Sequence, residues 1–192
     1  MNSLRARRVC IALIALTLMC AVCVAFAEVG LTPRIVYQES FQVVGIDAST
    51  NNQKESGPDA IIGKLWQQFL SEGLLNKIPD RVDQSIIAVY TDYATDADGQ
   101  YTFILGAKIR PIPDPTLPEG MVVKTVPAGR YGVFTTDRGP VAKVVVQTWK
   151  QIWSYYKSPA NGQRAYRADF EVYDQRAADP NNAQVEIYIG LK

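Results

Sequence analysis

The hydrophobic residues along the chain change their spacing several times, and each change predicts a new element. Alternating apolar positions predict strands over 34–49, and apolar positions three and four residues apart predict a helix that begins near Ile61 and ends before Pro79. Two further β-rich segments, 85–93 and 101–109, follow across a turn-rich loop. The first half of the sequence therefore predicts strand, helix, strand and strand in that order.

The same order recurs after a proline-rich segment. Residues 111–119 hold four prolines, a density that interrupts both helices and strands and predicts a linker. After it, 121–136 is strand-like, a helical pattern follows Pro140, and 166–174 and 184–191 predict a final strand pair. The second half of the sequence thus repeats the pattern of the first.

The two halves can be laid over each other with an offset of 83 positions. Trp66 then meets Trp149, and Tyr90 meets Tyr173. Chance is the alternative explanation for a few matches at one offset, but the order of elements recurs with them. We therefore predict a duplicated α+β domain in which each half contributes sheet and one helix to a shared core.

Residues 1–27 form a separate segment. They contain three arginines, all three cysteines of the chain and no acidic residue, and a long uncharged run ends in Ala-Phe-Ala. This layout is typical of a secretory signal peptide, although retention as a membrane anchor is the alternative. We expect cleavage at about Ala27, a periplasmic or extracellular location, and a binding domain at 28–192 with halves of about 34–110 and 120–192.

The composition of the remaining body excludes several kinds of chemistry. The chain has 20 Lys and Arg against 19 Asp and Glu, so removing three arginines leaves 17 basic against 19 acidic residues, without cysteine or histidine. Disulfides, cysteine nucleophiles, Ser-His-Asp triads and zinc sites of His or Cys are thereby excluded. Haem would lack its usual axial ligands except tyrosine, so we expect no cofactor and no metal. The weak net acidity argues against nucleic acid as a partner.

The final strand pair carries the most informative side chains. Glu171 and Tyr173 share one face of the first strand, and Glu186 and Tyr188 share one face of the second. If the strands pair as a hairpin, one face of the sheet could gather both carboxylates and both tyrosines. The alternative is an ordinary half-buried sheet, with Val and Ile inward and Glu and Tyr in water.

A pocket for a lipophilic cation would give these residues a function. Aromatic faces attract a cation by roughly 0.5 to 2 kcal/mol each, and a cation would offset the cost of burying a carboxylate. Besides the tyrosines of the final strands, the aromatic candidates for the lining are Tyr90, Tyr93, Trp149 and Trp153. The two tryptophans lie at apolar helix positions and could equally belong to the core.

Four segments occur in the order typical of a known family: Phe41–Ile46, Val126–Tyr131, Asp169–Asp174 and Val185–Ile189. On these segments, nearly all of the body resembles the GyrI-like family of small-molecule-binding domains, also called the AraC-type effector-binding family. The resemblance implies an α+β fold of tandem pseudo-symmetric β-α-β-β repeats. These repeats would form a curved antiparallel sheet with two main helices and a ligand cleft at their junction.

The resemblance also implies roles for individual residues. By motif position, Glu171 corresponds to the buried glutamate that meets cationic aromatic drugs in multidrug-sensing relatives. Glu186 and Tyr188 correspond to the second acidic and aromatic positions of the pocket. Gly190 departs from the pattern, because relatives often carry a proline there.

The predicted function is an exported protein, without a DNA-binding segment, that captures amphipathic cationic aromatic ligands. The expected ligand-binding residues are Glu171, Tyr173, Glu186, Tyr188, Tyr90, Trp149 and Trp153. Two alternatives stay open: a hydrolase of strained or electrophilic small molecules that uses Glu171 and Glu186, and a protein-interaction module whose cleft is vestigial. The expected partner is a small molecule, and a membrane only if the signal segment is retained.

Overall fold

A computed structural model describes residues 32–111 and 116–192. The expected signal segment, residues 1–27, and the centre of the expected linker lie outside these described residues. Among the described residues, no helix combines the length and the apolarity needed to cross a bilayer.

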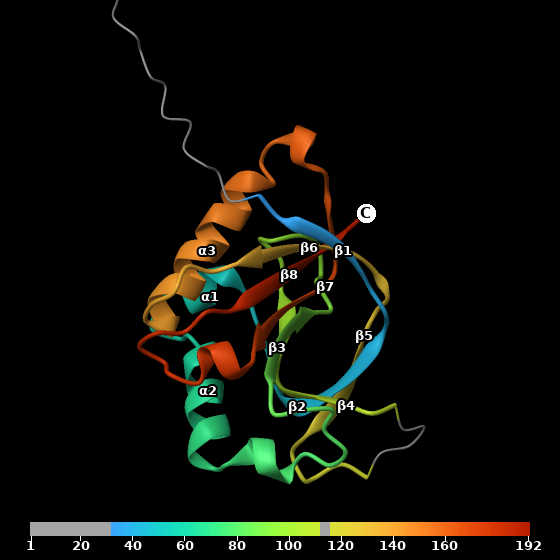
Figure 1. Cartoon of the computed structure of the whole chain (residues 1–192), viewed down its shortest axis with the longest axis vertical. Helices are drawn as coiled ribbons and strands as arrows, with labels where there is room; N and C mark the ends of the chain where they lie inside the picture. Colours follow the sequence, from blue (N-terminus) through green and yellow to red (C-terminus); the bar gives the residue numbers. More distant parts are fainter. Residues whose placement is uncertain (1–31, 112–115) are drawn as a thin grey trace, which may run out of the picture. The chain divides into compact units, whose positions relative to one another are not determined.

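The described residues form one sheet in which every neighbouring pair of strands is antiparallel. The strand order across the sheet is β1-β6-β8-β7-β3-β4-β2-β5. The strands are β1 (Arg34–Gln38), β2 (Phe41–Thr50), β3 (Ile86–Thr91), β4 (Tyr101–Ile109), β5 (Val122–Val126), β6 (Gly129–Thr135), β7 (Arg164–Tyr173) and β8 (Glu186–Leu191). The sheet is strongly curved (Figure 1), and β7 and β3 are its two central strands.

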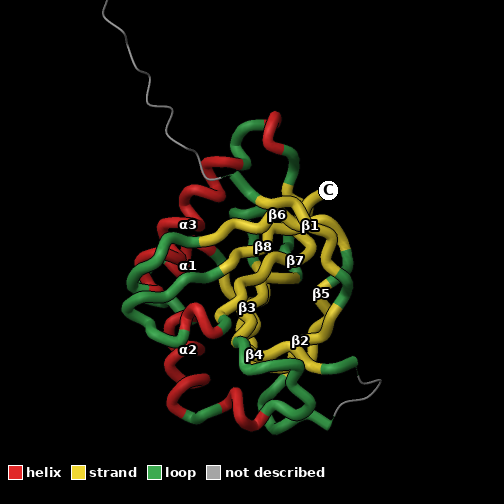
Figure 2. Tube along the Cα trace, viewed as in Figure 1, coloured by secondary structure: helices red, strands yellow, loops and turns green. Residues whose placement is uncertain are grey.

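Two main helices lie on one side of the sheet (Figure 2). They are α2 (Ile62–Ser71) and α3 (Val141–Tyr155), and short helical segments accompany them: α1 (Asn52–Glu55), η1 (Leu74–Lys77), η2 (Pro159–Asn161) and η3 (Gln175–Ala177). Each main helix buries an apolar stripe, with Leu65 and Phe69 on α2 and Val144, Trp149 and Ile152 on α3. These stripes hold the helices against the sheet, because apolar residues three and four apart share one helix face.

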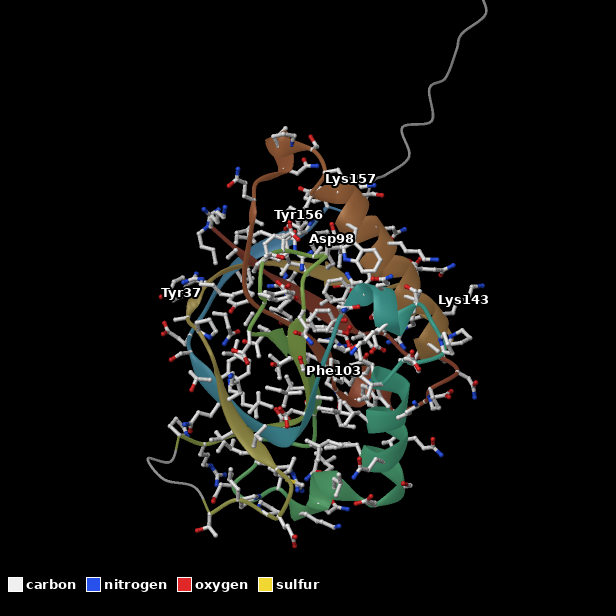
Figure 3. The ribbon with its side chains drawn as sticks, turned by 180° about the vertical axis from the view of Figure 1, so that it is seen from behind. Tyr37, Asp98, Phe103, Lys143, Tyr156 and Lys157 are labelled. Carbon is white, nitrogen blue, oxygen red and sulfur yellow. The ribbon has the colours of Figure 1, made fainter. Side chains whose placement is uncertain are left out.

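Side chains alternate between the two faces along each strand. Because both faces of this sheet hold buried clusters, the strands contribute to the core on both sides. On the helix side, one cluster lies under α2 and another under α3. Phe103 belongs to the first of these, and Figure 3 shows it at the centre of the molecule beside α2. The concave side holds a third cluster, which includes Phe41, Val89 and Phe170. The core is therefore shared by both halves of the sequence, as predicted.

The strand order gives the two halves an exchanged arrangement. Each half supplies an edge strand that pairs with the other half, since β1 pairs with β6 and β5 pairs with β2. The order β1-β6-β8-β7 on one side thus mirrors β5-β2-β4-β3 on the other. The predicted α+β fold, a curved antiparallel sheet of pseudo-symmetric β-α-β-β repeats with two main helices, is confirmed.

A pair of glycines permits a close strand approach in the first half. Gly45 and Gly106 lie directly opposite each other on β2 and β4. A Cβ atom added at Gly45 would lie 2.1 Å from the Leu105 carbonyl oxygen, and one added at Gly106 would lie 1.9 Å from the Val44 carbonyl oxygen. Any side chain at either position would therefore push the two strands apart.

Replacing Gly45 with alanine is expected to lower the free energy of unfolding by about 1–3 kcal/mol, because the backbone must move to admit the methyl group. Gly63→Ala is the matched control. Gly63 lies in α2, where an added Cβ meets nothing within 4 Å, so that change should raise stability by up to about 1 kcal/mol. Urea unfolding of both variants measures the difference. Equal stability of the two would contradict the close-approach explanation.

Candidate functional site

A cleft of 1320 Å³ lies on the helix side of the sheet, between α2 and α3. Its floor includes Tyr90 of β3 and Glu171 and Tyr173 of β7, and its walls include Trp66 of α2 and Trp149 of α3. Leu70, Val146 and Trp153 at its rim expose large apolar surfaces. The cleft is thus an apolar and aromatic space with a carboxylate on its floor, at the junction of the two halves.

Glu171 is the central polar group of the cleft, and only 1% of its surface is exposed. Its Oε1 accepts hydrogen bonds from the Tyr90 hydroxyl at 2.9 Å and from the Trp149 indole nitrogen at 2.6 Å. Its Oε2 accepts one from the Tyr173 hydroxyl at 2.6 Å. Three donors therefore fix the carboxyl group from β3, β7 and α3.

The protonation of Glu171 reflects two opposing effects. Burial raises its pKa, because removal from water disfavours the charged form, while the hydrogen bonds from Trp149, Tyr173 and Tyr90 act in the opposite direction. Burial has the larger effect, so the pKa of Glu171 lies above its ordinary value. Burial and the nearby carboxylate also raise the pKa of Tyr90 and of Tyr173 well above 10. Both tyrosines consequently remain hydrogen-bond donors at neutral pH.

A second buried carboxylate lies on the same strand face, two residues before Glu171. Asp169 is 0% exposed, and its Oδ2 accepts hydrogen bonds from Tyr93 at 2.7 Å and from Arg164 at 2.6 Å. Its Oδ1 accepts one from the backbone N–H of Gly190 at 2.8 Å. Gly190 therefore has a role that proline could not fill, because proline has no N–H to donate.

The two carboxylates differ in their charge balance. Arg164, which is 6% exposed, forms a salt bridge with Asp169. Burial is the largest single effect on Arg164 and opposes its charge, but Asp169 together with Tyr93 and Tyr166 outweighs burial and raises the pKa of the guanidinium. In the described part of the chain, no Lys or Arg nitrogen lies within salt-bridge distance of Glu171. The charge of Asp169 is balanced by Arg164, whereas the hydrogen-bond donors to Glu171 are the uncharged side chains of Tyr90, Trp149 and Tyr173.

The structure brings five of the seven predicted binding residues to the cleft. They are Glu171, Tyr173, Tyr90, Trp149 and Trp153. The alternative in which Glu171 and its neighbours face water does not hold for Glu171. The predicted grouping of both carboxylates and both tyrosines on one face is wrong, as the pairing of β7 with β8 shows.

Glu186 and Tyr188 lie on the concave face of the sheet. Glu171 pairs directly with Ile187, so that Glu186 and Tyr188 pair with Val172 and Phe170 instead. Residues directly opposite each other in an antiparallel pair share a face, and the Tyr188 ring accordingly stacks on Phe170 at 4.4 Å. Glu186 forms salt bridges with Arg34 and Arg176. The carboxylate pair that a hydrolase was expected to use is therefore not assembled.

The cleft also contains residues that the sequence did not single out as ligand contacts. Trp66 lines it, and its ring meets Tyr173 edge-on at 4.8 Å. Glu55 lines it near the start of α2, where its carboxylate accepts hydrogen bonds from the backbone N–H groups of Ile61 and Ile62. The sequence did contain a signal for Trp66, since the offset of 83 positions aligns it with Trp149, one of the predicted binding residues. Nothing in the sequence near Glu55 indicated its position. Among the described residues, no group of acidic side chains is arranged to hold a metal ion.

The raised pKa of Glu171 predicts a pH dependence of stability. The folded state holds this proton more tightly than the unfolded state, so the stabilisation is complete below the ordinary value of 4.5 and is lost as the pH rises through the folded pKa. Asp174 acts with the opposite sign, because the hydrogen bond that it accepts from Arg176 lowers its pKa. Its contribution to stability is lost as the pH falls. Tyr90 and Tyr173 do not titrate in this range.

Comparison with a Glu171→Gln variant isolates the contribution of Glu171, since Asp174 is common to both proteins. The unfolding free energy of the unaltered protein, relative to that of the variant, should decline as the pH rises from about 4.5 through the raised pKa of Glu171 in the folded state. Urea unfolding at several pH values measures this difference. Parallel pH profiles would show that the Glu171 carboxyl has the same pKa in the folded and unfolded states.

Comparison with known proteins places the chain in a family. The family model of Cass2, described as an integron-associated effector binding protein, matches residues 34–191. YobU of Bacillus subtilis (strain 168) is 35% identical over 159 residues, which cover 82% of this chain and 96% of that protein. An integron cassette protein from the mobile metagenome of Vibrio cholerae, known from its crystal structure, is 32% identical with a TM-score of 0.65. The match covers 84% of this chain and 96% of that one.

A more distant structure shares the fold. SAV2435, whose structure was determined bound to tetraphenylphosphonium, is 19% identical with a TM-score of 0.67 over 83% of this chain and 93% of that chain. The family match extends over nearly all of the described residues, and the fold is that of small-molecule effector-binding proteins. The chain belongs to the integron-associated effector binding proteins, within the GyrI-like effector-binding family.

Proposed function

We propose that this protein binds a lipophilic cation in the cleft, with the positive charge against Glu171. The observation that carries the proposal is a buried carboxylate that has three neutral donors and, among the described residues, no positively charged partner. A cation supplied by a ligand would favour the ionised form of Glu171 and offset the cost of its burial.

The lining of the cleft supports an aromatic or otherwise apolar ligand. Trp66, Tyr90, Trp149, Trp153 and Tyr173 present rings to the cleft. Rings attract a cation through their faces and bury apolar surface at the same time. The exposed Trp153 and its apolar neighbours at the rim would lose contact with water when such a ligand binds. Charge and apolar surface together would therefore set the ligand class.

Tetraphenylphosphonium is a suitable first probe, because SAV2435 shares the fold and its structure was determined with that cation. Tetraphenylborate is the matched control, since it has nearly the same shape and the opposite charge. We expect saturable quenching of tryptophan fluorescence by the phosphonium ion and at least roughly tenfold weaker binding of the borate ion. Equal binding of the two ions would refute charge recognition.

We further propose that the protein is exported. The predicted signal peptide at residues 1–27 would place the cation-binding domain outside the cytoplasm. Determination of the N-terminal sequence of the mature protein, expected to begin at Glu28, would check this.

A further inference from the structure

The aromatic rings around Glu171 repeat across the two halves of the chain. Tyr90 and Tyr173 are 83 positions apart, and each donates a hydrogen bond to one of the two carboxyl oxygens. Trp66 and Trp149 are also 83 positions apart. Each tryptophan packs edge-on against the tyrosine of the other half: Trp66 on Tyr173 at 4.8 Å and Trp149 on Tyr90 at 5.1 Å, both at an interplanar angle of 68°.

Glu171 lies at the centre of this arrangement. On β3 its direct cross-strand partner is Ala88, and these two positions are themselves 83 apart. A residue that pairs with its own equivalent lies on the axis that relates the two halves. The axis therefore passes between Ala88 and Glu171. Trp66 and Tyr173 form one ring pair beside it, and Trp149 and Tyr90 form the equivalent pair.

The small side chain of Ala88 has a consequence for the charge. The equivalent position in the first half carries no carboxylate. One negative group therefore lies at the centre of a nearly symmetric arrangement of four rings, those of Trp66, Tyr90, Trp149 and Tyr173. The arrangement is not perfectly symmetric, because Trp149 donates a hydrogen bond to Glu171 Oε1, whereas the contact given for Trp66 is with the Tyr173 ring. A ligand would nevertheless find aromatic surface on both sides of the charge.

We propose that the preferred ligands are monocations whose charge lies between two aromatic groups. One group would pack on the side of the cleft that Trp66 lines, and the other on the side that Trp149 lines. This inference rests on the proposed cation-binding function and specifies its ligand class. A cation with its charge at one end could place its aromatic part in only one half of the cleft while the charge lies at Glu171.

Two isomeric cations test this geometry, because they have the same formula and charge. Dibenzyldimethylammonium carries its charge between two phenyl rings, and (biphenyl-4-ylmethyl)trimethylammonium carries it at one end. Isothermal titration calorimetry should show about tenfold tighter binding of the dibenzyl ion, in proportion to one additional aromatic contact. Trp66→Leu should weaken binding of the dibenzyl ion by about fivefold and remove most of the difference between the isomers.

The outcomes separate this inference from the proposed function. Equal affinities of the two isomers for the unaltered protein, or tighter binding of the end-charged ion, would overturn the inference and leave cation binding intact. Binding of tetraphenylphosphonium with no binding of either isomer would also overturn it. Failure of all three cations to bind would overturn the proposed function and this inference with it. The comparison of isomers needs no variant, and circular dichroism would establish that the Trp66→Leu protein is folded.

Discussion

Glu171→Gln is expected to reduce the affinity for tetraphenylphosphonium by roughly 10- to 100-fold, because the ligand loses the buried counter-charge on the floor of the cleft. The amide has nearly the same shape as the carboxyl group, and its oxygen can still accept hydrogen bonds from Tyr90 and Trp149. The loss would therefore report charge rather than packing. Titration of tryptophan fluorescence measures it directly.

The same substitution should leave the unliganded protein at least as stable as before at neutral pH. Glutamine carries no charge that must be buried, and the raised pKa of Glu171 shows that burial opposes its ionised form. Weaker binding combined with undiminished stability is the expected signature of a group kept for ligand recognition.

Glu186→Gln serves as the matched control for this prediction. Glu186 lies on the concave face, paired with Val172, and forms its salt bridges with Arg34 and Arg176. Its replacement should change the affinity for the cation by less than about twofold, since partly exposed ion pairs contribute little and the site is on the other face. A large loss in Glu186→Gln with none in Glu171→Gln would reverse the assignment of the binding carboxylate.

Asp169→Asn is expected to have the largest effect on stability, a loss of about 3–5 kcal/mol, although Asp169 is only two residues from Glu171 on the same face. The change would leave Arg164 charged, buried and without its counter-ion. The amide oxygen could still accept the hydrogen bond from Gly190, so the measured loss would mainly reflect the unpaired guanidinium. Urea unfolding followed by circular dichroism measures this loss.

Asp174→Asn provides the comparison on the same segment. Asp174 pairs with Arg176 through side chains that are 29% and 31% exposed, and water screens such a pair, so a loss below about 1 kcal/mol is expected. A loss in Asp169→Asn no larger than that in Asp174→Asn would show that Arg164 finds another partner or water.

The order of elements could be predicted from the sequence because it depends on local spacing of apolar residues. The placement of Glu171 and Tyr173 on one face also followed from alternation along a single strand. The relation between β7 and β8 did not follow, because a shift of one residue in register exchanges the two faces. The register of this pair is interrupted between Arg164 and Asp169, and nothing in the local sequence indicates such an irregularity.

The buried salt bridge between Arg164 and Asp169 was also beyond prediction. The two residues are five positions apart, and the geometry that joins them depends on the irregular part of β7 and on the approach of Gly190 from β8. Tyr93 reaches the same carboxylate from the loop after β3. Contacts of this kind arise from three separate segments, so a search for motifs in one segment cannot find them.

The exchange of edge strands between the halves bears on how such a cleft could originate. A chain that contained one half could complete an equivalent four-stranded sheet by exchanging its first strand with a second copy, so the topology is that of a strand-swapped homodimer joined into one chain. In that dimer the positions of Ala88 and Glu171 would carry the same residue, and two glutamates there would face each other across the dimer axis and repel. Fusion of the copies into one chain frees these two positions to diverge. A single, uncompensated carboxylate at the centre of the cleft is an arrangement that a symmetric dimer of identical chains could not achieve.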